Sequence, residues 1–203
     1  MKLFPILLCF LFVAAGSGAT ELTDLGQGLG YLRVGAPDEA IKPLAGSGAL
    51  VLDLRRAAAT SEATAAFATA LASRPVGTRL FVLVGPATPV ELAATLKGNL
   101  ITLGIKGSHP EPQVVVQQTA EDDARACDAL AAGTALAELI SGKVTKDRYD
   151  EAALVQEFKN GNHDAHPPEA ATSSEKNAGA PVLTDRVLQR AVHLHQALLA
   201  LKR

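Results

Sequence analysis

Runs of consecutive apolar residues, each bounded by glycine, proline or polar residues, are the clearest pattern in the chain. The central run, residues 80–84, carries five apolar side chains without polar alternation. Such a run is typical of a parallel strand buried on both faces. A short helical segment at 92–97 and a second apolar run at 100–104 follow it. Residues 79–107 therefore predict a strand, a helix and a second strand joined by a right-handed crossover.

Similar runs predict strands on either side of this unit. Residues 28–34 and 49–55 are rich in β-forming side chains and are bounded by glycine and proline. Residues 113–117 follow two prolines and are typical of an edge strand. The alanine-rich segment 61–73 predicts a helix between two of the strands. This order predicts an α/β fold with a layered β-sheet and βαβ crossovers.

Helical patterns dominate the remainder of the chain. Thr119 is a capping residue for a helix that Gly133 interrupts and that continues over 135–141. A further short helix is predicted from Tyr149 to Phe158. The last helix is capped by Thr184 and Asp185, and its apolar stripe comprises Leu188, Ala191, Val192, His195, Leu198 and Leu199. We expect this amphipathic helix to dock on the main body or on a partner chain.

Both the N-terminus and residues 162–181 differ in composition from the predicted domain. An apolar run over residues 3–15 ends near small residues at Gly16 to Ala19 and is shorter than the ~20 residues of a membrane span. It predicts a cleaved export signal and a periplasmic or secreted protein, with an uncleaved N-terminal anchor as the alternative. Residues 162–181 lack apolar bulk and predict a disordered linker. The predicted organisation is a signal peptide (1–19), an α/β domain (20–161), the linker (162–181) and a C-terminal helix (182–203).

Composition narrows the range of partners. The chain has 203 residues and a formal net charge of -2, so it has no basic field to attract nucleic acid or an anionic membrane surface. Aromatic residues make up only 4 % and tryptophan is absent, so the core must consist of aliphatic side chains. We expect a protein or peptide partner, with no nucleic acid and, after signal cleavage, no membrane.

Few side chains suggest chemistry of their own. Cys127 lies in an alanine-rich helix and is expected to be a small apolar filler rather than a catalytic thiol. Two histidine pairs, 163/166 and 193/195, lie in the predicted linker and on different faces of the last helix, so no metal site is predicted. No glycine-rich loop precedes a helix to hold phosphate, and no cofactor is predicted. Asp53 lies in an apolar strand, where a structural carboxylate paired with arginine or a loop N–H is expected and a catalytic carboxylate is the alternative.

Four separate segments resemble the C-terminal processing (tail-specific) serine peptidases. Residues 28–34 look like the opening strand of that family, and residues 49–55 closely resemble its Leu-Val-Leu-Asp-Leu-Arg strand. Residues 80–104 are similar to its nucleophile strand, helix and following strand, and residues 185–191 look like its closing helix. The resemblance implies a crotonase/ClpP-like spiral core and descent from a serine-type endopeptidase.

The resemblance also implies where an active site would lie, and this chain departs from it there. Thr88 occupies the position of the nucleophilic serine, and Lys106 is the candidate general base. The family's lysine lies several residues further on, where this chain has Pro110. The oxyanion-binding Asn-x-x-Gly-Gly segment is replaced by residues 56–60. No PDZ module is expected before the first strand, because only about nine residues follow the predicted cleavage site.

The sequence around Thr88 indicates a structural role for this hydroxyl. Residues 88–91 form a capping box with proline at the first helical position, so the Thr88 oxygen is expected to accept a hydrogen bond from the helix backbone. We therefore expect a catalytically inactive homologue that acts as a peptide-binding, protein-binding or scaffolding domain. One alternative is a residual serine-type peptidase or hydrolase that uses Thr88 and Lys106.

A further alternative concerns assembly. The C-terminal helix could pair with another chain through Leu188, Val192 and Leu199.

Overall fold

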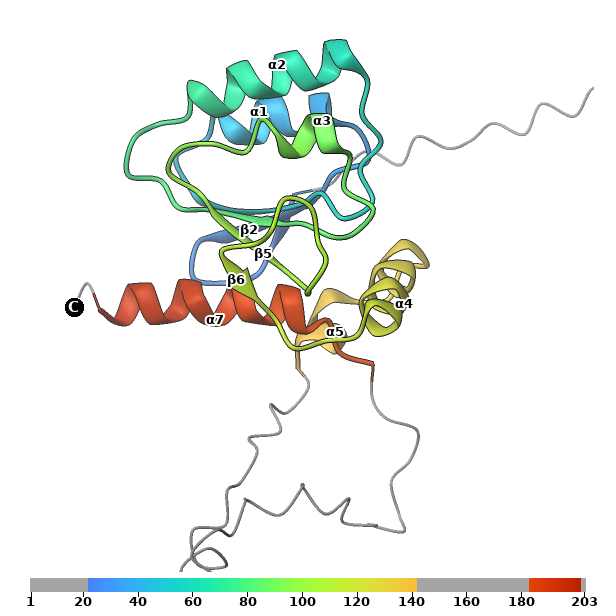
Figure 1. The fold of residues 1–203 in the computed structure, drawn as a ribbon. Helices are drawn as coiled ribbons and strands as arrows, with labels where there is room; N and C mark the ends of the chain where they lie inside the picture. The colour runs from blue at the N-terminus through green and yellow to red at the C-terminus, as the bar shows by residue number, and fades with distance from the viewer. Residues whose placement is uncertain (1–21, 142–182, 202–203) are drawn as a thin grey trace, which may run out of the picture.

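A six-stranded sheet with helices on both faces forms the body of the protein (Figure 1). The computed structural model describes residues 22–141 and 183–201. The strands are β1 (Thr23–Asp24), β2 (Leu29–Arg33), β3 (Ala49–Asp53), β4 (Leu80–Leu83), β5 (Ile101–Gly104) and β6 (Val114–Val115). The predicted α/β class is confirmed, since helices connect the strands from β2 to β5 within one layered sheet.

Strand order in the sheet follows the order in the chain, from β1 to β6. β1 is antiparallel to β2, and every other neighbouring pair is parallel. The 3-10 helix η1 (Pro37–Ala40) and α1 (Ile41–Leu44) connect β2 to β3, α2 (Ser61–Ala72) connects β3 to β4, and α3 (Val90–Ala93) connects β4 to β5. Helices α1, α2 and α3 all lie on the same face (Figure 1). The chain therefore advances by one strand at each crossover and returns over the same face each time.

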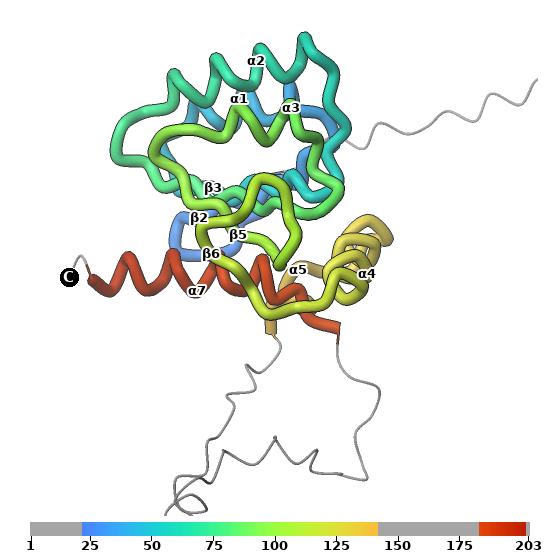
Figure 2. The backbone as a smooth tube through the Cα atoms, in the orientation of Figure 1, coloured from blue at the N-terminus to red at the C-terminus, as the bar shows by residue number. Residues whose placement is uncertain are grey.

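The opposite face is covered by the C-terminal half of the chain. After the edge strand β6 come α4 (Ala120–Ala131) and α5 (Leu136–Ile140), and α7 (Arg186–Ala200) closes the described part. Figure 2 shows α7 running beneath the strands, with α4 and α5 beside its N-terminal end. Thr119 caps α4 as predicted, because its Oγ1 accepts a hydrogen bond from the backbone N–H of Asp122.

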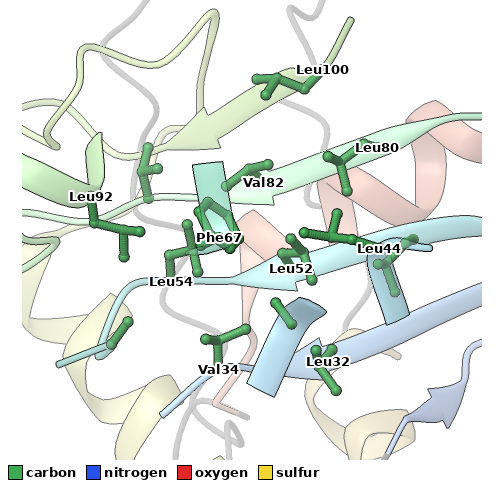
Figure 3. Close-up of a cluster of buried hydrophobic side chains, with 14 residues drawn as sticks. Leu32, Val34, Leu44, Leu52, Leu54, Phe67, Leu80, Val82, Leu92 and Leu100 are labelled. Carbon is green, nitrogen blue, oxygen red and sulfur yellow. The ribbon is translucent and has the colours of Figure 1, made fainter. Parts of the chain in front are cut away.

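Side-chain alternation along each strand divides the core into two layers. One layer lies beneath α1 to α3 and includes alternate residues of β2, β3 and β4 together with Phe67 of α2 (Figure 3). The other lies against α7 and includes the intervening residues of the same strands, such as Tyr31, Val51 and Phe81. This is the packing that uninterrupted apolar runs predict, since both faces of a parallel sheet are covered.

Helix α7 packs against the chain's own sheet. Leu188 and Val192 belong to the buried layer on this face, and Asp185 caps the helix by accepting from the Leu188 N–H at 2.9 Å. His195 is buried with its ring edge-on to Phe81, whereas His193 is exposed, so the two rings lie on different faces as predicted. Because Leu188 and Val192 are buried within the chain, pairing with another chain would have to use other residues of this helix.

Several predictions fall outside the described residues. These are the signal peptide, the helix from Tyr149 to Phe158 and the linker at 162–181.

Candidate functional site

The hydroxyl of Thr88 lies at the carboxyl end of β4, where a parallel sheet would hold a reacting group. The side chain is only 3 % exposed. Its Oγ1 accepts a hydrogen bond from the Gly85 N–H at 2.9 Å and donates one to the Leu54 carbonyl at 3.2 Å. Both partners are backbone groups, and they tie the turn after β4 to the end of β3.

The predicted capping box is wrong in its detail. α3 is a single turn whose N-cap is Pro89, and no side chain caps it. Pro89 has an extended ψ of 136°, so the helix begins one residue later than the pattern predicts and Thr88 precedes the cap. The hydroxyl is engaged by backbone, as expected, but by the preceding turn and the neighbouring strand rather than by the helix.

Lys106, the candidate base, lies in the loop after β5. This loop reaches the Thr88 turn, because the His109 N–H donates to the Gly85 carbonyl at 3.2 Å. The two loops are therefore neighbours in the fold. The two side chains differ in environment, however, since Lys106 is exposed and Thr88 is buried. Both hydrogen bonds given for the Thr88 hydroxyl go to backbone groups, and neither involves Lys106.

The segment that replaces the oxyanion glycines uses its amides within the fold. The Ala57 N–H donates to the Leu54 carbonyl at 3.3 Å, and the Ala58 N–H donates to the Gly35 carbonyl at 2.8 Å. An oxyanion hole requires N–H groups that point at the reacting carbonyl and have no other partner. These two amides do not meet that requirement.

A buried ionic cluster lies at the ends of β2 and β3. Arg55 is 2 % exposed and stands between three carboxylates, those of Asp53, Asp123 and Asp185. The closest contacts of its guanidinium to these carboxylates are 2.7, 2.7 and 2.6 Å, in that order. The Tyr31 hydroxyl donates to Asp53 Oδ2 at 2.9 Å. The expectation of a structural Asp53 paired with arginine is confirmed, and its partner is Arg55.

This cluster, which we call the Arg55 cluster (Tyr31, Asp53, Arg55, Asp123 and Asp185), joins distant parts of the chain. Asp123 belongs to α4 and Asp185 is the cap of α7, so one guanidinium ties both helices to the end of β3. Of the five members, only Asp53 was singled out from the sequence, and the other four were not predicted to belong to a site. The sequence carries weak signals for them, namely the carboxylates in the first turn of α4, the cap of α7 and the arginine that ends the 49–55 run.

Burial and the charges of the Arg55 cluster shift the pKa values of Asp53, Asp123 and Tyr31. Burial would raise the pKa of Asp53, but the Arg55 guanidinium and its hydrogen bonds outweigh burial and hold that pKa below its ordinary value. Burial raises the pKa of Asp123, and the attraction of Arg55 offsets only part of this. Burial and the neighbouring Asp53 carboxylate raise the pKa of Tyr31. Of Asp53 and Asp123, the Asp123 carboxyl is therefore the less stabilised as an anion.

Asp123→Asn should therefore change stability in a pH-dependent way. A carboxyl whose pKa is higher in the folded state than in the unfolded state contributes stability while protonated and loses it as pH rises above the unfolded value of about 4. The asparagine variant has no carboxyl at this position, so it does not lose stability in this way as pH rises. Urea unfolding from about pH 4 to pH 7 should show the variant becoming more stable relative to the parent as pH rises. If the free energy of unfolding of the variant relative to the parent falls as pH rises, or does not change with pH, the raised pKa of Asp123 is contradicted.

Cys127 is buried on α4 next to the Arg55 cluster. Burial raises the pKa of its thiol to about 12. This environment agrees with the predicted role as an apolar filler, because a reactive cysteine needs a stabilised thiolate.

In a Cys9→Ser variant, Cys127 should react with a disulfide reagent at neutral pH far more slowly in the native state than in urea. The raised pKa alone corresponds to a thiolate population on the order of 10³-fold smaller. Rapid stoichiometric modification of the native protein would show that the thiol is accessible and activated.

A groove lies on the α7 side of the sheet. It has a volume of about 840 Å³ and lies between the β1–β2 edge and the α4–α5 corner. A smaller hollow of about 230 Å³ adjoins it, and the two share Arg33, Gly35, Leu130 and Ala131. Thr88 and Lys106 border neither hollow. These two hollows therefore lie away from Thr88, the position that the resemblance assigns to the nucleophile.

Within the described residues, no group of histidine, cysteine, aspartate or glutamate side chains could hold a metal ion. None of the described helices combines the length and apolar character that a bilayer crossing requires.

Comparison with known proteins identifies no relative. No protein-family model, no curated sequence and no solved structure matches this chain at a significant level. The similarity to the tail-specific peptidases thus stays a prediction from the sequence.

Proposed function

We propose that this chain is an exported, non-catalytic binding domain that is related in fold to the tail-specific serine peptidases and takes a peptide or protein partner. The observation that carries the proposal is the hydrogen bonding of Thr88. Its hydroxyl is buried, accepts from Gly85 and donates to Leu54. A nucleophile needs a base that removes its proton and a free approach to the substrate. Here the proton is directed at a backbone carbonyl.

The remaining parts of a serine-type mechanism are also altered. Lys106 is exposed, and the amides of Ala57 and Ala58 donate within the fold. Loss of one oxyanion donor typically lowers the rate about 10²–10³-fold. With the base displaced as well, efficient hydrolysis is not expected.

The topology supports the proposed relationship. Parallel strands in sequential order, with three crossovers on one face, are compatible with one turn of a crotonase/ClpP-like spiral. We propose this closer fold assignment on the topology together with the sequence similarity of residues 28–34, 49–55 and 80–104.

The groove supports a binding role. Its volume of about 840 Å³ lies in the range of about 300–1,000 Å³ that is usual for ligand pockets. Its lining combines apolar side chains such as Leu130, Leu136 and Ile140 with a few polar ones. It also borders β1, the outermost strand of the sheet within the described residues, and peptides commonly bind at sheet edges by adding a strand.

The proposal is tested with purified protein, an unstructured fluorogenic peptide and a small activated ester. We expect no turnover above that of buffer and no difference between the parent, Thr88→Ala and Lys106→Ala. Hydrolysis that disappears in both variants would overturn the proposal and establish the residual hydrolase. A matched control is Lys97→Ala, which removes another lysine of the described region from a different loop.

A further inference from the structure

Strand β6 is the outermost strand of the described sheet on the side away from β1. Gly104 and Val115 are register partners, and the Val116 N–H donates to the Gly104 carbonyl at 2.8 Å. Neighbouring residues of a strand direct their N–H and C=O groups to opposite edges. The N–H and C=O of Val115 therefore point away from β5, to an edge where no described strand pairs with them.

This strand is fixed to the sheet by contacts on its inner side. The Gln113 N–H donates to Thr102 Oγ1 at 2.9 Å, and Gln113 Oε1 accepts from the Thr102 N–H at 3.3 Å. Val114 and Val116 pack against the apolar layer on the α7 side. A partner that pairs with the outer edge would therefore meet an ordered strand, which lowers the entropic cost of binding.

Residues 113–117 lack most of the features that prevent pairing at natural sheet edges. Their sequence, Gln-Val-Val-Val-Gln, contains no charge and no proline, and valine favours extended backbone. Val115 is 47 % exposed, so about half of an apolar side chain is in contact with solvent. One protective feature remains, because β6 has only two residues. Association at this edge is therefore expected to be weak and reversible.

The sequence of the edge indicates its partner, because residues 113–117 read the same in both directions. In a two-fold symmetric contact, residue i of one copy faces residue j of the other, and j faces i. With the axis at Val115, the two Val115 residues face each other and exchange N–H···O=C bonds. Each Gln113 then faces Gln117 of the second copy, so identical or similar uncharged residues meet along the whole edge.

The charges at the two ends of the edge favour an antiparallel arrangement. Glu111 is exposed just before the edge, and the Arg186 guanidinium donates to the Gln117 carbonyl at 3.3 Å at its other end. An antiparallel pair brings Glu111 of one copy to the end that carries Arg186 of the other, whereas a parallel pair would place like charges together. Arg186 also attracts Asp122, which is itself paired with Arg125.

We propose that two copies of this chain associate through the outer edges of β6, by antiparallel pairing of residues 113–117 about a two-fold axis at Val115. The two six-stranded sheets then form one continuous sheet. This inference goes beyond the proposed function and uses neither Thr88 nor the groove, which lies beside β1 at the opposite edge.

Sedimentation velocity of the full chain from about 5 to 500 μM tests the association. We expect a reversible monomer–dimer equilibrium with a dissociation constant on the order of 10–100 μM, as for other small interfaces. Val115→Lys should weaken the dimer about tenfold or more, because two like charges then face each other across the axis. Val115→Thr, which stays β-branched and uncharged, should keep it. Val76→Lys is the control, because Val76 is fully exposed in another loop.

A cross-link tests the register and does not depend on a loss of association. Facing residues of such a pair have Cα atoms about 5.5 Å apart, which a disulfide can bridge. In a Cys9→Ser chain, Val115→Cys should therefore give a disulfide-linked dimer under mild oxidation, while Val76→Cys should give little. Circular dichroism and urea unfolding of each variant show whether it is folded.

Three results would overturn the inference. A parent that stays monomeric at 500 μM would show that this edge is covered by the chain itself or takes another partner. A dimer that folded Val115→Lys leaves unchanged, with no cross-link through Val115→Cys, would place the contact elsewhere on the molecule. Growth beyond the dimer would exclude a closed two-fold pair.

Discussion

Arg55→Met is expected to unfold the protein or to lower its free energy of unfolding by about 3–5 kcal/mol. The substitution leaves Asp53, Asp123 and Asp185 in a buried site without their common cation. Removing one partner of a buried ion pair costs far more than the pair contributes, because the remaining charge stays desolvated. Here three charges are affected together, and the anchors of α4 and α7 are lost with them.

Arg56→Met provides the matched control for this experiment. Arg56 is the next residue and also pairs with an aspartate, Asp128, but both side chains are largely exposed. Exposed pairs contribute about 0–1 kcal/mol, so this variant should stay near the parent. Urea unfolding followed by circular dichroism measures both. Equal effects of the two substitutions would show that the Arg55 cluster does not hold the fold.

Phe67→Ala is expected to destabilise the protein by about 3–5 kcal/mol. Phe67 is fully buried on α2 and, within the described part of the chain, is the only aromatic member of the layer beneath α1 to α3 (Figure 3). Its neighbours are leucine, valine and alanine side chains, which are too small to fill the space that it would leave. In a chain with 4 % aromatic residues, one ring accounts for a large share of the burial in its layer.

Val76→Ala is the control for the core substitution, because Val76 is fully exposed in the loop after α2. A surface change of this kind should stay within about 0.5 kcal/mol of the parent. Thermal unfolding of the parent, Phe67→Ala and Val76→Ala compares their stabilities. A Phe67→Ala variant as stable as Val76→Ala would mean that α2 is not packed on the sheet as described.

The strands were predictable because each apolar run must be covered on both faces. The runs at 28–34, 49–55, 80–84 and 100–104 became β2 to β5 in order, and the proline-flanked run became the edge strand β6. The capping box predicted that the helix after β4 begins at Pro89, but α3 spans Val90–Ala93 and also ends before the predicted segment 92–97 does. The extended conformation of Pro89 moved the start of that helix, and a pattern of residue types does not specify which side of a proline becomes helical.

The Arg55 cluster could not be predicted, for a different reason. Arg55 lies 68 residues from Asp123 and 130 residues from Asp185, so only the three-dimensional fold brings them together. Asp53 was predicted to have a structural partner because a carboxylate in an apolar strand needs one. That partner, Arg55, is only two residues further along the chain, but its contacts with α4 and with the cap of α7 depend on the fold. The placement of Arg33 beside a groove formed partly by α5 depends on the fold as well.

The central claim is that the Thr88 hydroxyl serves the fold and not a reaction. Thr88→Val keeps the shape of the side chain and removes only the hydroxyl, which leaves the Gly85 N–H and the Leu54 carbonyl without this partner in a buried turn. We predict that the free energy of unfolding of Thr88→Val, measured in urea, falls by about 1–3 kcal/mol. An unchanged or increased stability, the behaviour common when a catalytic residue is replaced, would contradict the account.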